Sequence, residues 1–112
     1  MRSDRERLLD ILEAIEKIEQ RIGQDRAAFD ADAMLQVWVV HHLQIIGEAA
    51  NRLSNDFLTR HPVISWGKLI GMRHVLVHGY FEIDLEIVWK AVEQDIPALK
   101  SQIQRILELP DY

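Results

Sequence analysis

Apolar residues recur at helical spacing along most of the chain, and this periodicity limits the folds open to it. Between residues 8 and 22 they lie three or four positions apart, which places them on one face of a helix. The same spacing returns between residues 35 and 53 and between residues 85 and 106. No segment shows the period-two alternation of a half-buried strand. The pattern therefore predicts an all-α protein.

Capping residues mark where the first two helices begin and end. Ser3 and Glu6 form a capping box ahead of the first periodic segment, and Gly23 follows its end. Asp30 is the candidate cap of a second helix that covers about residues 31–54. This helix is apolar on more than one face, which predicts a central position or a place in an interface between chains.

The third helix is short and lies between two helix breakers. A helical turn ends before Pro62, since the residue before proline disfavours helical geometry. Ser65 then caps a helix that we expect to run from Trp66 to about His78, where Gly79 ends it.

The last helical region begins at Asp84, a candidate cap. Pro97 must kink this region or restart it, because proline has no N–H for the helical ladder, and Asp95 could cap the restart. Together these segments predict an up-and-down helical bundle of four to five helices. A length of 112 residues fits a single domain, residues 1–112.

Composition narrows the class of protein further. The chain has no cysteine, which excludes disulfides and zinc–thiolate sites. Its first residues are densely charged, unlike a secretory signal, and no apolar run approaches the ~20 residues that span a bilayer. We therefore expect a cytoplasmic protein without a membrane partner. The formal net charge is −5, so contact with nucleic acid would require a local basic pocket.

The segment GMRHVLVHGYFEID, residues 71–84, is the candidate functional site. Arg73, His74, His78 and Tyr80 lie within eight positions among valines and leucines. Each has a structural explanation. A histidine on an apolar helix is more often a core residue, an arginine near a helix end binds carbonyls or a carboxylate, and a tyrosine packs with its hydroxyl at the surface.

The spacing of these residues raises two geometric questions. His74 and His78 lie four apart, like two metal ligands on one helix face, but the glutamate of the HExxH pattern is absent. We therefore expect no metal and no cofactor. Arg73 and His78 would lie about 140° apart around a straight helix. They meet if the helix unwinds near Gly79, if the arginine reaches around it, or if a second chain supplies the missing partner.

The residue types suit attack on an RNA phosphodiester, because RNA carries its own nucleophile in the ribose 2′-hydroxyl. A neutral histidine can take or relay that proton near pH 7. An arginine can offer paired donors to the phosphate as negative charge builds. A tyrosine can orient the phosphate or stack on a base. Residue types alone do not single out this reaction.

At these residues the chain resembles HEPN-domain proteins, specifically the HepT-like toxins. Arg73, His78 and Tyr80 match the Arg-x4-His-x-Tyr pattern of that family. The stretches IIGEAANRLS, IGMRHVLVHGYFEID and LEIVWKAVEQDIPAL are also similar to it. The resemblance covers nearly the whole chain and is weakest in the first 25 residues.

The resemblance implies a metal-independent endoribonuclease toxin with Arg73 and His78 as catalytic residues. It implies a homodimer in which both copies of the motif line one cleft, which would answer the geometric question. It also implies a partner, a minimal nucleotidyltransferase antitoxin of the MntA type, that transfers AMP to Tyr80. Such a modification would add bulk and negative charge beside Arg73 and would repel RNA.

Supporting or RNA-binding roles are predicted for three residues, Tyr80, His74 and Glu48. His74 follows the motif arginine, a position that is polar in many HEPN proteins, and would share a helix face with His78. Glu48 follows Gly47 on the helix that we expect to face the cleft. An ordinary ion pair with Arg52 would also explain this glutamate.

Two other interpretations stay open at this point. One is a non-catalytic module that binds a nucleotide or interacts with a minimal nucleotidyltransferase. Binding of ATP without turnover of RNA would favour it. The other is a dimerising helical protein whose histidines are core residues, and loss of folding in a His78 variant would favour that reading.

Overall fold

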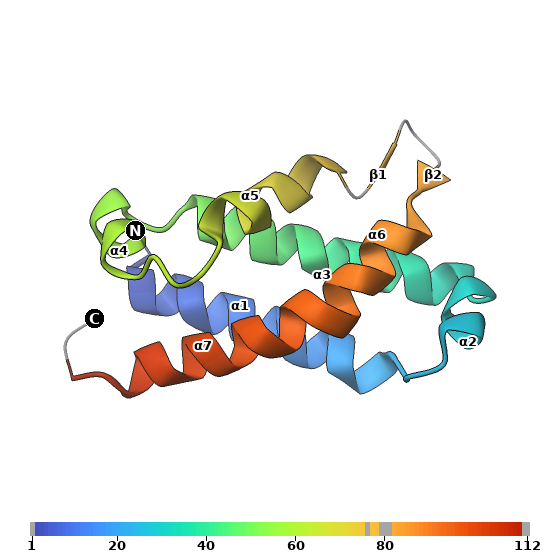
Figure 1. Ribbon diagram of the computed structural model, residues 1–112, viewed down its shortest axis with the longest axis horizontal. Coiled ribbons are helices and arrows are strands. Elements are labelled where there is room, and N and C mark those ends of the chain that lie inside the picture. Colours follow the sequence, from blue (N-terminus) through green and yellow to red (C-terminus); the bar gives the residue numbers. More distant parts are fainter. Residues whose placement is uncertain (1, 76, 79–81, 111–112) are drawn as a thin grey trace.

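The computed structural model describes residues 2–75, 77–78 and 82–110, with side chains described for residues 2–72 and 83–110. In these ranges the chain forms six helices, counting α6, η1 and α7 as one continuous helix. The four longer helical segments run alternately up and down, which confirms the all-α class and the up-and-down arrangement (Figure 1). The described residues form six helices, whereas four to five were predicted. The elements are α1 (Asp4–Arg21), α2 (Arg26–Asp30), α3 (Ala33–Asn51), α4 (Asn55–Arg60), α5 (Trp66–Val75), β1 (Val77–His78), β2 (Glu82–Ile83), α6 (Leu85–Lys90), the π-helical turn η1 (Ala91–Asp95) and α7 (Ile96–Glu108).

The first helix begins with the predicted capping box. The backbone N–H of Glu6 donates to the Ser3 hydroxyl (3.2 Å), and the Ser3 N–H donates to the Glu6 carboxylate (3.0 Å). These hydrogen bonds hold the pKa of Glu6 below its ordinary value. Next to the box, the Asp4 carboxylate accepts from the backbone N–H (2.9 Å) and hydroxyl (2.7 Å) of Ser54, the cap of α4. The starts of α1 and α4 are thus joined.

The second long helix begins later than predicted. Its cap is Asp32, whose carboxylate accepts from the backbone N–H of Leu35 (3.0 Å), and α3 ends at Asn51. Asp30 is not the cap, because it is the last residue of the short helix α2, which Asp25 caps. Helix α2 was not predicted from the sequence.

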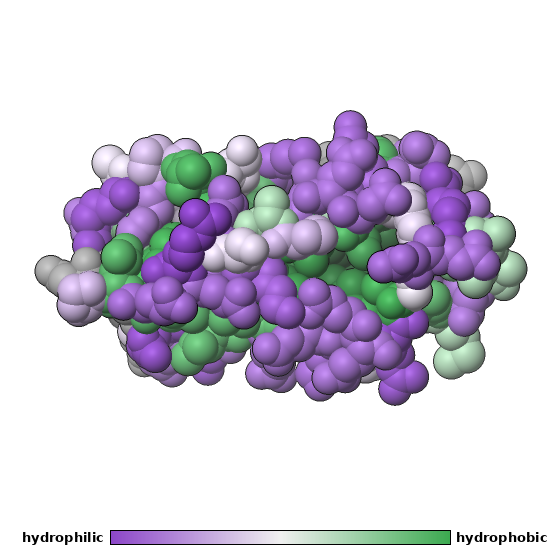
Figure 2. All heavy atoms as spheres, turned by 60° about the horizontal axis from the view of Figure 1, so that its bottom comes forward, coloured by the Kyte–Doolittle hydropathy of each residue, from purple (hydrophilic) through white to green (hydrophobic). Residues whose placement is uncertain are grey.

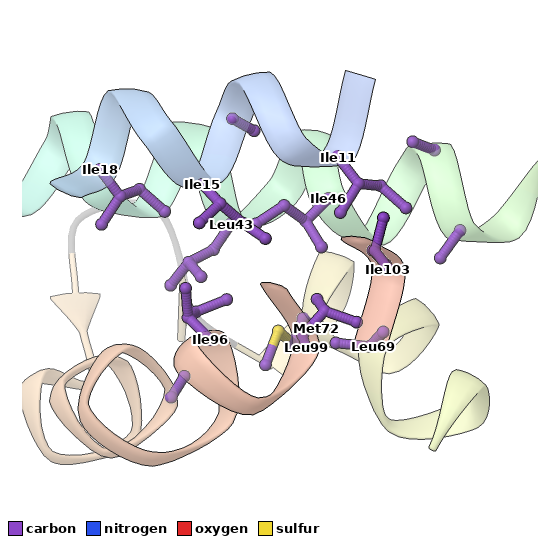
Figure 3. Packing of buried hydrophobic residues seen from close by; sticks show 14 of the residues in the cluster. Ile11, Ile15, Ile18, Leu43, Ile46, Leu69, Met72, Ile96, Leu99 and Ile103 are labelled. Carbon is purple, nitrogen blue, oxygen red and sulfur yellow. The ribbon is translucent and has the colours of Figure 1, made fainter. Parts of the chain in front are cut away.

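Helix α3 lies at the centre of the bundle, as its apolar composition predicted. It packs against both α1 and α5. Figure 3 shows that buried side chains from four helices converge beside it. These residues are Ile11, Ile15 and Ile18 of α1, Leu43 and Ile46 of α3, Leu69 and Met72 of α5, and Ile96, Leu99 and Ile103 of α7.

The last helix widens into a π-helical turn ahead of Pro97, where the sequence predicted a kink or a restart. Residues 91–95 form the π-helical turn η1, and the N–H of Ile96 donates to the carbonyl of Ala91, five residues back. Ala91 is buried, whereas the next residue, Val92, is half-buried. The extra residue in the turn therefore shifts which side chain reaches the core.

The predicted restart cap at Asp95 is wrong. Asp95 has helical backbone angles (φ −81°, ψ −41°), whereas a capping residue needs an extended backbone. The helix continues through this position without a new start. The Asp95 carboxylate instead accepts from the Lys68 ammonium of α5 (3.2 Å).

Across the parts of the chain that the structure describes, no helix is both long and apolar enough to cross a bilayer. Figure 2 shows one face of the molecule that is mostly hydrophilic, with apolar surface in strips between rows of polar side chains.

His61, just after α4, should make the free energy of unfolding depend on pH. Its ring packs on Phe57 (4.6 Å between centroids), and among the described residues its buried Nε2 has no hydrogen-bond partner. Burial, and to a lesser extent the charge of Arg60, lower the pKa of His61 from its ordinary 6.5. The unfolded chain therefore binds a proton here more readily than the native state. The contribution of neutral His61 to the free energy of unfolding is therefore fully present above pH 6.5, the ordinary pKa of the unfolded chain. It is lost as the pH falls through the lower pKa of the native state.

Urea unfolding at pH 7.5, 6.5 and 5.5 tests this prediction. His61→Gln should lose less stability than the wild type over that range, since the backbone carbonyl of His61, which accepts from the Trp66 indole (2.8 Å), is kept. The exposed His41 gives a matched control, His41→Gln. Equal pH dependence in His61→Gln and the wild type would contradict the prediction.

Candidate active site

Helix α5 carries Arg73 and His74 in its last turn. Three apolar residues spaced three apart, Trp66, Leu69 and Met72, are buried and fix this helix against the core. Figure 3 shows Met72 and Leu69 directed toward Leu99 of α7. Because Met72 faces the core, the position of Arg73 lies about 100° further around the helix axis.

The helix ends earlier than predicted, at Val75, and His78 does not belong to it. Val77 and His78 form the two-residue strand β1, which pairs antiparallel with β2, so that Val77 lies opposite Ile83 and His78 opposite Glu82. β-Branched valine favours an extended backbone, which fits this change. The predicted helix end at Gly79, and Tyr80 itself, lie outside the described residues.

Because α5 ends at Val75, Arg73 and His78 do not share a helix, and two expectations from helical geometry no longer apply. The angle of about 140° between Arg73 and His78 assumed one straight helix through both residues. The shared face of His74 and His78 assumed the same, so neither a metal pair at that spacing nor support of His78 by His74 follows from helical geometry. Arg73 and His74 come from a helix, and His78 from the hairpin that follows it.

The chain returns from the hairpin into α6, which is fixed at its start. The Asp84 carboxylate caps α6 by accepting from the N–H of Ile87 (3.1 Å), as predicted. Arg26 of α2 donates to Glu86 (2.9 Å) and to Asp30 (3.1 Å), and these bonds raise the pKa of Arg26 above its ordinary value. The start of α6 is therefore tied to α2, although exposed ion pairs of this kind contribute little stability.

Glu48 lies in the last third of α3 and lines a cavity of about 270 Å³ between α1 and α3, together with His42. Its carboxylate accepts from Arg52 (2.9 Å), which confirms the predicted ion pair. Figure 1 shows α3 and α5 running antiparallel, so the end of α3 lies where α5 begins and the hairpin lies at the other end of α5. The supporting role of Glu48 stays a prediction.

The two adjacent histidines of α3 differ in their surroundings. His42 is 5% exposed, and its Nδ1 lies 2.7 Å from the carbonyl of Trp38, so this nitrogen carries the proton and donates it. The ring of His42 also packs on Trp38. His42 is thus a core histidine with a satisfied nitrogen. His41 is exposed.

A second cavity lies between α5 and α6, beside the helix ends that lead into and out of the hairpin. The sequence did not single out its two lysines, Lys68 and Lys90, and it singled out the aspartate, Asp95, only as a helix cap. Lys68 lies within two helical turns of Arg73, which could have marked it as a residue near the site. Its ion-pair partner Asp95 is 27 residues further along the chain, so the sequence did not indicate the pair. The described residues contain no group of three or more histidine, aspartate or glutamate side chains arranged to hold a metal ion.

Comparison with known proteins defines the class to which this helical fold and its motif belong. A family model described as "Ribonuclease HepT-like" matches residues 11–106, a range that includes Arg73, His78 and Tyr80. The chain belongs to this family.

Individual relatives agree with that assignment. The chain is 41% identical over 106 residues to a protein named "Probable ribonuclease HepT" from Thermococcus cleftensis, covering 94% of this chain and 96% of the relative. It is 38% identical over 98 residues to a "Putative RNase" of Methanocaldococcus jannaschii, covering 87% of this chain and 90% of that protein. A "Putative RNase" of Caldanaerobacter subterraneus is 34% identical, covering 96% of this chain and 97% of that protein. No solved structure matches the chain.

Proposed function

We propose that this chain is an endoribonuclease toxin that cleaves RNA without a metal ion. The observation that carries the proposal is the match of the HepT-like ribonuclease family over residues 11–106, with the Arg-x4-His-x-Tyr pattern inside the matched range. The position of the motif supports it further. Arg73 lies in the last turn of a helix that is fixed to the core, and His78 follows on a hairpin.

The reaction that fits these residues uses the nucleophile of the substrate. His78 removes the proton of the ribose 2′-hydroxyl, directly or through water, and the 2′-oxygen attacks the adjacent phosphorus. The bond from phosphorus to the 5′-oxygen breaks, and that oxygen takes up a proton. The products are a 2′,3′-cyclic phosphate and a 5′-hydroxyl. Arg73 donates to the phosphate oxygens as negative charge builds. Tyr80 orients the phosphate, and His74 supports binding of the RNA.

A homodimer is part of the proposal, because one copy of the motif supplies a single arginine and a single histidine. Two large apolar side chains of α3 support an interface there. Met34 is 84% exposed and Val37 is 60% exposed, and they lie three residues apart on one side of the helix. Two copies of Arg73 in one cleft would also give an acidic protein the local positive charge that RNA requires.

Incubation of the purified protein with a short RNA in excess EDTA tests the reaction. We expect the same cleavage rate with EDTA as without it, because the scheme has no step that needs a metal ion. The products should carry the cyclic phosphate. Loss of cleavage in EDTA that added Mg²⁺ restores would contradict metal independence. Binding of ATP without RNA cleavage would instead support the non-catalytic nucleotide-binding module.

The proposed partner is a minimal nucleotidyltransferase antitoxin that transfers AMP to the Tyr80 hydroxyl. The phosphate added to that oxygen would lie two residues from His78, where it would occupy the site of the scissile phosphate and repel RNA. Co-expression with such an enzyme should increase the intact mass by one or more AMP units and should suppress cleavage. Tyr80→Phe should gain no mass. A mass gain that persists in Tyr80→Phe would contradict the assignment of this tyrosine.

A further inference from the structure

The cavity between α5 and α6 has a volume of about 210 Å³ and lies beside the candidate active site. Met72, the residue before Arg73, lines it from the last half of α5. Ile87 lines it from the start of α6, three residues after the cap that follows the hairpin. Since the hairpin joins these two helix ends, the cavity lies at its base.

The floor of this cavity is apolar and its border is charged. Met72 and Ala91 are 4% and 3% exposed, and Ile87 is 38% exposed. Two lysines and one aspartate surround them, Lys68, Lys90 and Asp95. On a chain with a net charge of −5, this border has an excess of one positive charge.

The two lysines differ in what they bind. The Lys68 ammonium lies 3.2 Å from the Asp95 carboxylate and so spans from α5 to η1. Lys90 is exposed, and among the described residues no carboxylate lies within ion-pair distance of it. The acid four residues before Lys90 on α6, Glu86, is bound by Arg26. Lys90 is therefore the cation at this cavity that is available to an anionic ligand.

We propose that this cavity is a subsite for one nucleotide of the RNA beside the cleaved bond. The base lies on the apolar floor of Met72, Ile87 and Ala91, and Lys90 binds a backbone phosphate. The inference rests on the proposed ribonuclease function and adds to it a determinant of base preference. The cavity is smaller than the ~300–1,000 Å³ of sites for drug-sized ligands, which suits one base with its sugar and phosphate outside.

Asp95 supplies the contact that distinguishes one base from another. A carboxylate has about four acceptor sites, so Asp95 can bind Lys68 and accept from a second donor. Its side chain is 26% exposed, which leaves it within reach of a ligand. Cytosine has an amino group at position 4 that donates to a carboxylate, whereas uracil has a carbonyl oxygen there that a carboxylate repels. The subsite therefore prefers cytosine to uracil.

A neighbouring cavity continues the path of the RNA strand away from the hairpin. Its volume is about 180 Å³, and it shares Lys68 and Asp95 with the first cavity. Its other polar lining residues are neutral, namely Ser65, Gln94 and Gln102. No second carboxylate is among the described residues that line it, so the strand would meet no added repulsion there.

Two substitutions and two matched controls test the subsite on the full-length protein. Lys90→Gln removes the free cation, and Arg105→Gln removes an exposed cation from the last turn of α7. Asp95→Asn removes the negative charge of an ion-paired aspartate and keeps its shape. Asp56→Asn is its control, because it makes the same change at an aspartate that is paired with Arg60 (3.0 Å). The RNA substrates are short oligouridines that carry one cytosine at each position in turn. Fluorescence anisotropy measures binding over a range of salt concentrations, and gel analysis measures cleavage.

We expect the wild type to prefer one cytosine-containing substrate by roughly tenfold. Asp95→Asn should shift that preference toward uracil, because the asparagine amide can donate to the uracil oxygen. Lys90→Gln should reduce the slope of log affinity against log salt by about 0.7, the value for one phosphate contact to a single strand. Both controls should behave as the wild type.

The outcomes separate this inference from the proposed function. If the wild type cleaves RNA and either Asp95→Asn or Lys90→Gln matches its control, the subsite is overturned and the ribonuclease proposal stands. A wild type that neither binds nor cleaves any of these RNAs would overturn both. Both variants differing from their controls, with cleavage chemistry retained, would support the subsite.

Discussion

Replacing His78 with alanine is expected to abolish RNA cleavage, and replacing Arg73 with alanine is expected to do the same. Loss of a positioned proton-transfer group costs about 10²–10⁴-fold in rate. Loss of a donor to the charged oxygen of a transition state costs about 10²–10³-fold. Single-turnover cleavage of a short RNA measures both effects, and circular dichroism with thermal unfolding shows whether each variant folds.

Matched controls come from helix α3 and the residue that follows it, outside the motif. His41→Ala and Arg52→Ala remove an exposed histidine and an exposed arginine, and both should retain the wild-type rate. Cleavage that persists in His78→Ala and Arg73→Ala would reject these two residues as catalytic. An unfolded His78→Ala variant would favour the reading in which this histidine is structural.

Leu8→Ala is expected to reduce the free energy of unfolding by about 2–5 kcal/mol. Leu8 is 0% exposed on the inner face of α1, so its removal leaves a cavity that the surrounding side chains fill only in part. That loss is a large fraction of the ~5–15 kcal/mol that stabilises a typical domain. Urea unfolding followed by circular dichroism measures it.

The adjacent leucine provides the control for this substitution. Leu9 is 44% exposed, and Leu9→Ala should change stability by about 0.5 kcal/mol or less. The two variants have the same change in composition and the same change in helix propensity. Equal destabilisation by both would mean that the inner face of α1 does not pack as described.

Features set by neighbouring residues could be predicted from the sequence. The capping box at Ser3 and Glu6 and the Asp84 cap are local, since donor and acceptor lie three residues apart. The central position of α3 followed from its apolar composition. These three predictions were confirmed. At Pro97 the missing N–H predicted a kink or a restart, whereas the structure has a π-helical turn just ahead of it and no new start.

Features set by distant contacts or by two competing local signals were missed. Asp30 and Asp32 are both residues that favour the start of a helix. The sequence alone does not show that Asp30 is the last residue of α2 and that Asp32 caps α3. The early end of α5 depends on pairing between β1 and β2, which helical periodicity cannot reveal. Asp95 was read as a local cap, but its partner is Lys68, on another helix. The catalytic roles of Arg73 and His78 stay predictions.

The π-helical turn of residues 91–95 lets the last helix hold one extra residue without disturbing the packing beyond it. A π-helical turn holds one residue more than the α-helical turn it replaces. Deleting one residue there would let a regular α-helix form, and the residues after it would keep their faces, because the same turn would be made with one residue fewer. Ile96, Leu99 and Ile103 would still face the core that they now fill. A chain that is one residue shorter at this turn can therefore bury the same side chains in its final helix.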